Sequence, residues 1–64
     1  MNPLQKILYQ RITINREKRQ DIAAEFGISR ETLNILIRTG TIHSIEVVKR
    51  IAEKSGVSPD DLCG

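Results

Sequence analysis

Apolar residues recur at helical spacing in several stretches of the chain, and each stretch is bounded by capping or turn residues. At the start of the chain, Asn2 and Gln5 fit a capping box, and Pro3 suits the first position of a helix. The apolar positions that follow share one helical face and are Leu4, Ile7, Leu8 and Ile12. The pattern predicts an amphipathic first helix.

A second helix is expected to end at Gly27, because a glycine after a helical segment often adopts the left-handed conformation that stops the helix. The start of this helix stays open. Asn15 fits as the cap of a helix that begins at Arg16, and a beginning nearer Lys18 fits as well. The apolar face of the second helix consists of Ile22, Ala23 and Phe26.

Serines open the next two helices. Ser29 and Ser44 each precede a segment with helical apolar spacing, and the breaks after these segments are residues 39–41 and Gly56. The expected inward positions are Leu33, Leu36 and Ile37 in the third helix, and Ile45, Val48, Ile51 and Ala52 in the fourth. A further capping signature at residues 58–61 predicts a last helical turn that carries Leu62.

The composition agrees with a helical fold. A chain of 64 residues has room for one domain, which we expect to span residues 1–64. Hydrophobic residues make up 39% of the chain, with one Phe, one Tyr and no Trp, so the core must be aliphatic. Such a core suits short packed helices better than a sheet. The expected fold is therefore all-α, with five short helices.

Charge and cysteine content narrow the class of protein. The net charge is only +2, but seven of the ten Lys and Arg residues precede Thr39, and a basic cluster lies within residues 11–19. A basic half suits contact with phosphates, although a solvated helix junction has the same composition. Cys63 is the lone cysteine, and neither a membrane-spanning run nor a signal peptide is evident. We expect a cytoplasmic protein without an internal disulfide.

Residues 19–38 hold the most informative pattern. Ala23 is small where two helices would approach each other closely, and Gly27 tolerates the positive φ of a tight corner. The apolar residues that would lock the third helix across the second helix are Ile28, Leu33 and Leu36. These spacings fit one helix-turn-helix unit over about residues 18–38.

The stretch from about residue 18 to residue 62 resembles the Cro and phage-repressor (XRE-type) helix-turn-helix family. The matching positions are Ile22, Ala23, residues 26–30, Leu33, Leu36, Arg38, Ile45, Ile51, Ala52, residues 56–58 and Leu62. Arg19 holds the place that a Gln commonly has in the family. The resemblance implies a lambda-repressor-like DNA-binding domain of five helices, in which the third helix enters the major groove of duplex DNA.

The outward face of the third helix holds the residues expected to contact bases. Arg30 suits a bidentate contact with guanine, and Asn34 suits one with adenine. Glu31 can accept a hydrogen bond from cytosine, and Ile35 can contact the methyl group of thymine. Ser29 serves equally well as a helix cap, and Glu31 as a partner of the helix N-terminus. The full set is Ser29, Arg30, Glu31, Asn34, Ile35 and Arg38.

Phosphate contacts are expected from residues that flank this face. Two lie at the start of the second helix, and four are assigned by the resemblance to the family. They are Arg19, Gln20, Thr32, Thr39, Thr41 and His43. A His at the place of His43 is more often an ordinary loop residue. With one His and one Cys, the chain predicts no metal site, and we expect no cofactor.

The expected function is that of a sequence-specific transcriptional regulator of phage, prophage or bacterial type. It would bind a double-stranded DNA operator, as a homodimer at least on DNA. The expected contacts between two copies are Val57, Leu62 and the surface of the fourth helix. The chain could equally be an excised domain.

The alternative is a helical protein–protein interaction module of antitoxin or anti-regulator type that does not bind DNA. An enzyme is not expected, because the sequence offers no nucleophile with a nearby base, no phosphate-binding glycine loop and no carboxylate pair in an expected cleft.

Overall fold

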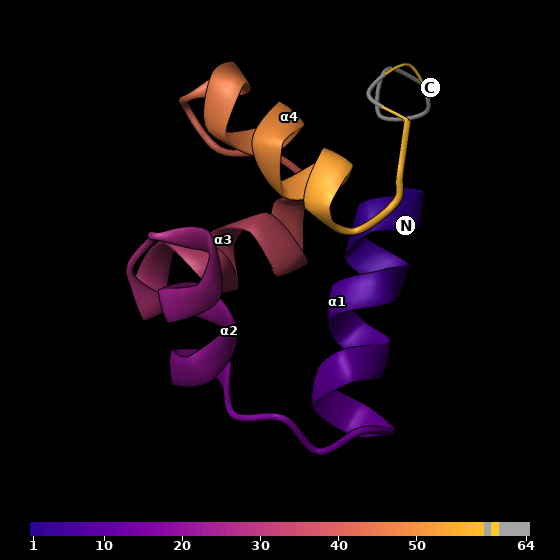
Figure 1. The fold of residues 1–64 in the computed structure, drawn as a ribbon, viewed down its shortest axis with the longest axis vertical. Helices are drawn as coiled ribbons and strands as arrows, with labels where there is room; N and C mark the ends of the chain where they lie inside the picture. Colours follow the sequence, from indigo (N-terminus) through magenta and orange to yellow (C-terminus); the bar gives the residue numbers. More distant parts are fainter. Residues whose placement is uncertain (59, 61–64) are drawn as a thin grey trace.

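The computed structural model describes residues 1–58 and residue 60, and this part of the chain contains helices and connections but no strand. Its four helices are α1 (Pro3–Thr13), α2 (Arg19–Phe26), α3 (Arg30–Thr39) and α4 (Ile45–Lys54) (Figure 1). The all-α class is therefore confirmed. The expected fifth helical turn falls mainly on residues 59, 61 and 62, which lie outside the described residues.

Most helix ends are where the capping signals place them. The side chains of Asn2, Ser29 and Ser44 accept hydrogen bonds from the first turns of α1, α3 and α4. Gly27 and Gly40 end α2 and α3 in the left-handed conformation, with φ angles of 68° and 84°. Local side-chain chemistry and glycine conformation thus fix these boundaries, as the sequence predicts.

The sequence left two starting points open for α2, Arg16 and a position nearer Lys18, and the structure shows the second of these. The helix begins at Arg19, with Lys18 in an extended conformation before it. Arg16 has a positive φ of 57°, which is incompatible with a helix that begins there. Asn15 consequently does not cap α2. The connection from α1 is a turn, and it leaves the first turn of α2 without a side-chain cap.

The hydrophobic core draws side chains from all four helices and from the segment after α4. Its buried residues are Leu4, Leu8, Ile22, Ala23, Phe26, Leu33, Leu36, Val48, Ile51, Ala52 and Val57. Ile45 was expected to point into the core, and this prediction is wrong, because its side chain is 66% exposed. Ile45 is the first residue of α4 and lies before the part of the helix that packs, so Val48 takes the first buried position.

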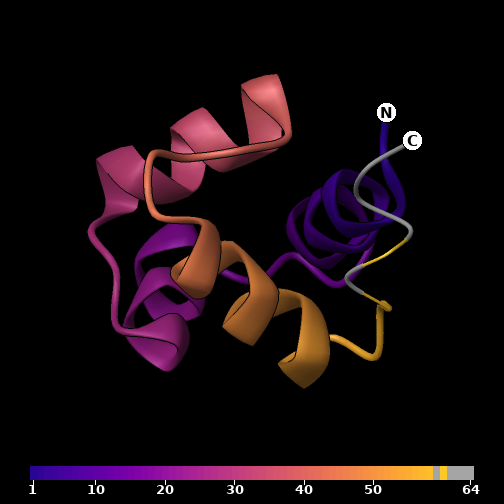
Figure 2. The ribbon, with the colours of Figure 1, turned by 90° about the horizontal axis from the view of Figure 1, so that it is seen from above.

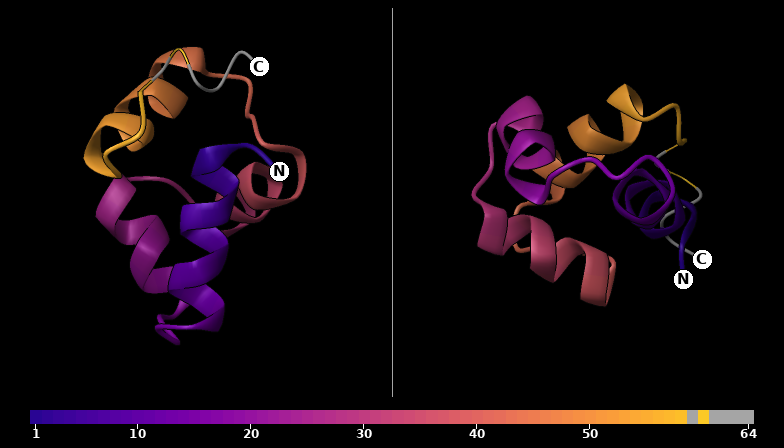
Figure 3. Two further views of the ribbon diagram at one scale, coloured as in Figure 1. Left: turned by 90° about the vertical axis from the view of Figure 1, so that its right-hand side faces the viewer. Right: turned by 90° about the horizontal axis from the view of Figure 1, so that it is seen from below.

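α3 packs against α1 and α2 with one side and lies at the rim of the molecule with the other. Figure 2 shows α3 along an outer edge, and the right-hand view of Figure 3 shows the same edge from the opposite direction. In both views, α2 and α4 lie on the same side of α3. The outer face of α3 is therefore left uncovered by the other described helices.

A hydrogen-bonded link joins the start of α1 to the end of α3. Gln5 is only 8% exposed, and its side chain accepts from the Asn2 backbone N–H at 2.8 Å. The Gln5 amide donates to the Ile37 carbonyl at 2.9 Å, and the Asn2 amide donates to the Gly40 carbonyl at 3.1 Å. The capping box of α1 therefore also holds the last turn of α3, a role that its local sequence pattern does not reveal.

Replacing Gly40 with alanine is expected to destabilise the protein more than the same change at Gly56. Both glycines have a positive φ, which costs an alanine about 1–2 kcal/mol. A Cβ at Gly40 would lie 2.8 Å from Asn2 Nδ2 and 3.0 Å from Gln5 Oε1, whereas a Cβ at Gly56 would meet nothing within 4 Å. We expect Gly40→Ala to lose about 1 kcal/mol or more beyond Gly56→Ala in urea unfolding. Equal losses would contradict the close approach of α1 to Gly40.

Candidate functional site

The outer face of α3 presents every side chain that the sequence predicts for base contact. These exposed residues are Ser29, Arg30, Glu31, Asn34, Ile35 and Arg38. Because an α-helix has 3.6 residues per turn, Glu31, Ile35 and Arg38 project away from the core. Leu33 and Leu36 on the inner side are fully buried. α3 is thus a ridge with a polar crest that includes one apolar side chain, Ile35, which is 42% exposed.

A polar hollow of about 470 Å³ lies on one flank of this ridge, where the α1–α2 connection and the start of α2 approach α3. It is lined by Ile12, Glu17, Lys18, Arg19, Gln20, Arg30 and Asn34. The polar hollow brings Arg30 and Asn34, expected to contact bases, together with Arg19 and Gln20, expected to contact phosphates. Residues expected to contact bases and residues expected to contact phosphates therefore lie together on one concave surface.

The charge in the polar hollow is predominantly positive. Lys18, Arg19 and Arg30 line it together with one carboxylate, that of Glu17. Arg11 donates two hydrogen bonds to Glu17, from Nε at 2.9 Å and from a terminal nitrogen at 2.8 Å. These bonds lower the pKa of the Glu17 carboxyl below its usual range and offset its negative charge. The hollow therefore remains attractive to an anion.

Arg11 also joins the two helices behind the polar hollow. Its guanidinium donates to both carboxylate oxygens of Glu25, at 3.0 Å and 2.8 Å, and lies 5.8 Å from the centroid of the Phe26 ring. The hydrogen bonds that Arg11 donates to Glu25 lower the pKa of the Glu25 carboxyl, and the hydrogen bonds that Glu17 and Glu25 accept raise the pKa of Arg11. The three side chains stay charged at neutral pH and fix the α1–α2 connection against α2.

The N-terminus of α2 differs from the other helix starts. Side chains cap α1, α3 and α4, whereas Lys18 at the N-cap of α2 supplies no side-chain hydrogen bond. The first-turn N–H groups of α2, beside the polar hollow, therefore lack a side-chain acceptor. These groups and the positive end of the helix dipole are the features with which helix N-termini bind phosphate.

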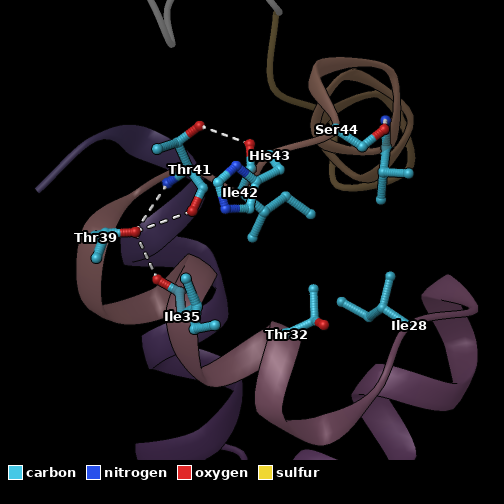
Figure 4. A pocket seen from close by; sticks show the side chains of 9 residues that line it. Ile28, Thr32, Ile35, Thr39, Thr41, Ile42, His43 and Ser44 are labelled. Atoms are coloured by element: carbon cyan, nitrogen blue, oxygen red, sulfur yellow. Dashed lines mark hydrogen bonds between the residues drawn. The ribbon is translucent and has the colours of Figure 1, made fainter.

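An apolar groove of about 600 Å³ lies on the other flank of α3, between this helix, the α3–α4 connection and the start of α4 (Figure 4). It is lined by Ile28, Thr32, Ile35, Thr39, Thr41, Ile42, His43, Ser44 and Val47. Figure 4 shows Ile28, Thr32 and Ile42 pointing toward one another across the groove. The lining includes no Lys, Arg, Asp or Glu side chain. Four of the six expected phosphate contacts lie here and not beside the polar hollow.

The hydroxyl groups around the apolar groove are engaged in local hydrogen bonds. Ser29 Oγ accepts from the Thr32 backbone N–H at 3.1 Å and pairs with the Thr32 hydroxyl at 2.8 Å, so the expected capping role of Ser29 is confirmed. The Thr39 hydroxyl lies 2.8 Å from the Ile35 carbonyl and 2.9 Å from the Thr41 carbonyl. The Thr41 hydroxyl donates to the Ile42 carbonyl at 3.3 Å. These groups are satisfied by the chain itself.

Both concavities contain residues whose sequence pattern does not predict a place in a site. Ile12 forms part of the polar hollow, and Ile28, Ile42 and Val47 form part of the apolar groove. Ile12 and Ile28 were assigned to the core, and both are half-buried at its edge. A hydrophobic pattern indicates that a side chain turns inward but does not show that one of its edges remains accessible.

Comparison with protein-family models, curated proteins and solved structures gives no match for this chain. Within the described residues, no group of three or more His, Cys, Asp or Glu side chains could hold a metal ion. None of the helices in this part of the chain has both the length and the apolarity needed to cross a membrane. The fold and its surface define a small all-helical protein with an exposed helix between two concavities.

Proposed function

We propose that this protein is a sequence-specific regulator of transcription that binds double-stranded DNA and resembles Cro and the phage repressors. In this proposal, α2, the connection at residues 27–29 and α3 form the helix-turn-helix of a lambda-repressor-like domain. The observation that carries the proposal is the convergence of Arg19, Gln20, Arg30 and Asn34 on the polar hollow beside an exposed helix. A helix can read a base sequence only when residues that contact the phosphates lie next to residues that contact the bases.

The dimensions of α3 fit the major groove of B-form DNA. A helix with its side chains is about 10–12 Å across, and the groove is about 12 Å wide. With the crest of α3 in the groove, Arg30 and Asn34 can reach the edges of bases. Arg19, Gln20 and the uncapped N-terminus of α2 then approach the phosphates of one strand. The two flanks of α3 lie toward the two walls of the groove.

One such unit reads only half of an operator. We propose that two copies bind together, because useful specificity generally requires two half-sites about 34 Å apart. The regulator would therefore act as a homodimer on DNA, in the cytoplasm, without a cofactor. Its operator would be an inverted repeat, since a two-fold symmetric dimer presents two identical α3 helices.

Arg19→Ala is expected to weaken binding to all duplexes by a similar factor. A phosphate contact carries no base information, so its loss reduces the slope of log K against log salt by about 0.9 without changing sequence preference. The slope can be measured by fluorescence anisotropy with an operator and with a random duplex. Lys6→Ala is the matched control, since Lys6 is exposed on α1 and does not line the polar hollow. An unchanged slope in Arg19→Ala would contradict the phosphate contact.

The apolar groove supports a second candidate, a protein–protein interaction module of antitoxin or anti-regulator type. An apolar surface beside exposed Ile35 is the kind of feature that a protein partner covers. The same salt titration distinguishes the two functions. Salt-sensitive binding to duplex DNA supports the regulator, whereas no DNA binding together with a tight protein complex supports the module.

A further inference from the structure

Arg11 binds two carboxylates, of which only one belongs to the polar hollow. Nε and a terminal nitrogen of Arg11 donate to the two carboxylate oxygens of Glu17, at 2.9 Å and 2.8 Å. Two further hydrogen bonds, at 3.0 Å and 2.8 Å, reach both carboxylate oxygens of Glu25 on α2. Glu17 lines the polar hollow, whereas Arg11 and Glu25 do not. A residue outside the hollow therefore controls a charge inside it.

The place of Glu17 is unfavourable for the binding of DNA. Its carboxylate lies among the cations that line the polar hollow, Lys18, Arg19 and Arg30. It also directly precedes Lys18, the N-cap of α2, whose first-turn N–H groups have no side-chain acceptor. A free carboxylate here would repel a phosphate and compete with it for the same cations. The hollow attracts a phosphate fully only when this negative charge is neutralised.

The contacts of Arg11 hold Glu17 at two points. The Glu17 backbone N–H donates to the Arg11 carbonyl at 3.0 Å, in addition to the two bonds between the side chains. The planar guanidinium matches a carboxylate with two parallel hydrogen bonds, which are stronger than bonds between neutral groups. The guanidinium also lies 5.8 Å from the centroid of the Phe26 ring, and the Arg11 side chain is only 21% exposed. The Glu17 carboxylate is thereby held toward α1.

We propose that Arg11 is a positioning residue for DNA binding, which holds and neutralises the Glu17 carboxylate beside the phosphates without contacting DNA itself. The proposal rests on the DNA-binding function proposed above. It explains how Lys18 and Arg19 remain available to a phosphate although a carboxylate precedes them in the chain. It also gives α1 a part in DNA binding, to which the outer face of α3 does not extend.

The test removes Arg11 and then the carboxylate that this change exposes. Arg11→Met keeps an unbranched apolar side chain beside Phe26 but removes the charge and the donors. We expect its Kd for a random-sequence duplex, measured by fluorescence anisotropy at about 0.1 M salt, to rise about five-fold. Adding Glu17→Gln to Arg11→Met should return the Kd to within about two-fold of the parent value. Recovery of this kind would not follow if Arg11 only stabilised the fold, because Gln does not replace its contacts.

Glu25→Gln is the matched control, because it makes the same charge change at the other carboxylate that Arg11 binds, outside the hollow. Added to Arg11→Met, it should improve the Kd by less than about two-fold. Urea unfolding followed by circular dichroism gives the folded fraction of each variant, for which its Kd is corrected. Glu17→Gln alone provides a test that keeps Arg11 in place. It should change the Kd by less than about two-fold, because the charge that it removes is already neutralised.

The possible results separate this proposal from the function on which it rests. Equal recovery from Glu17→Gln and Glu25→Gln would show that only net charge matters, and would overturn the role of Arg11. Absence of recovery from Glu17→Gln, or about five-fold tighter binding by Glu17→Gln alone, would overturn it too. All of these results leave the DNA-binding function standing. A parent protein that shows no salt-sensitive binding to duplex DNA overturns both proposals.

Discussion

Arg30→Ala is expected to weaken binding to a selected operator by about five-fold to 150-fold, which corresponds to about 1–3 kcal/mol. Arg30 is exposed near the N-terminal end of α3 and shares the polar hollow with Arg19 and Asn34. A guanidinium at this place can donate two parallel hydrogen bonds to one guanine. Its loss should relax the preference at one base pair of each half-site, and leave the preference at the other positions intact.

A conservative variant separates the charge of Arg30 from its geometry. Arg30→Lys keeps the positive charge but lacks the planar fork of donors that matches a guanine edge. We expect this variant to bind random duplexes as the parent protein does, and to lose much of the discrimination at the same base pair. The comparison is made by competition of single-base operator variants. An equal loss of affinity for operator and random DNA in Arg30→Ala would show that Arg30 only contacts phosphate.

Phe26→Ala is expected to leave most of the protein unfolded at 25 °C. Phe26 is the largest buried side chain and is 2% exposed, and truncating a core Phe typically removes about 3–5 kcal/mol. A domain of this size has a marginal core, so such a loss is comparable to its whole free energy of unfolding. The Phe26 ring also supports Arg11, which joins α1 to α2.

Circular dichroism at 222 nm during urea unfolding measures this effect. Tyr9→Ala is the matched control, because Tyr9 is the other aromatic residue and is 49% exposed on α1. Its truncation should change the free energy of unfolding by less than about 1 kcal/mol. A folded Phe26→Ala protein with a free energy of unfolding near that of Tyr9→Ala would contradict the core assigned here.

Capping residues made most of the fold predictable from sequence. Asn2, Ser29 and Ser44 act through backbone groups within a few residues, so their effects can be recognised locally. Apolar periodicity identified the core but wrongly placed Ile45 in it. Ile45 fits the helical spacing of α4, but as the first residue of the helix it does not pack against the core. The start of α2 stayed open until the positive φ of Arg16 excluded a helix there.

The candidate site was predictable residue by residue but not as a surface. Helical spacing alone was enough to select Arg30 and Asn34 as exposed side chains of α3. Their meeting with Arg19 depends on the angle between α2 and α3, which the spacing does not specify. The hydrogen bond from Gln5 to Ile37 spans 32 residues of sequence, beyond the reach of any local pattern. The apolar groove likewise depends on how α4 and the α3–α4 connection fold back beside α3.

Whether α3 reads a base sequence is tested by selecting bound duplexes from a random library at physiological salt. We expect enrichment of one sequence, arranged as an inverted repeat whose half-site centres are about 10 base pairs apart. Enriched duplexes should bind at least about 1,000-fold more tightly than random DNA. A library that stays random through repeated rounds would contradict the claim.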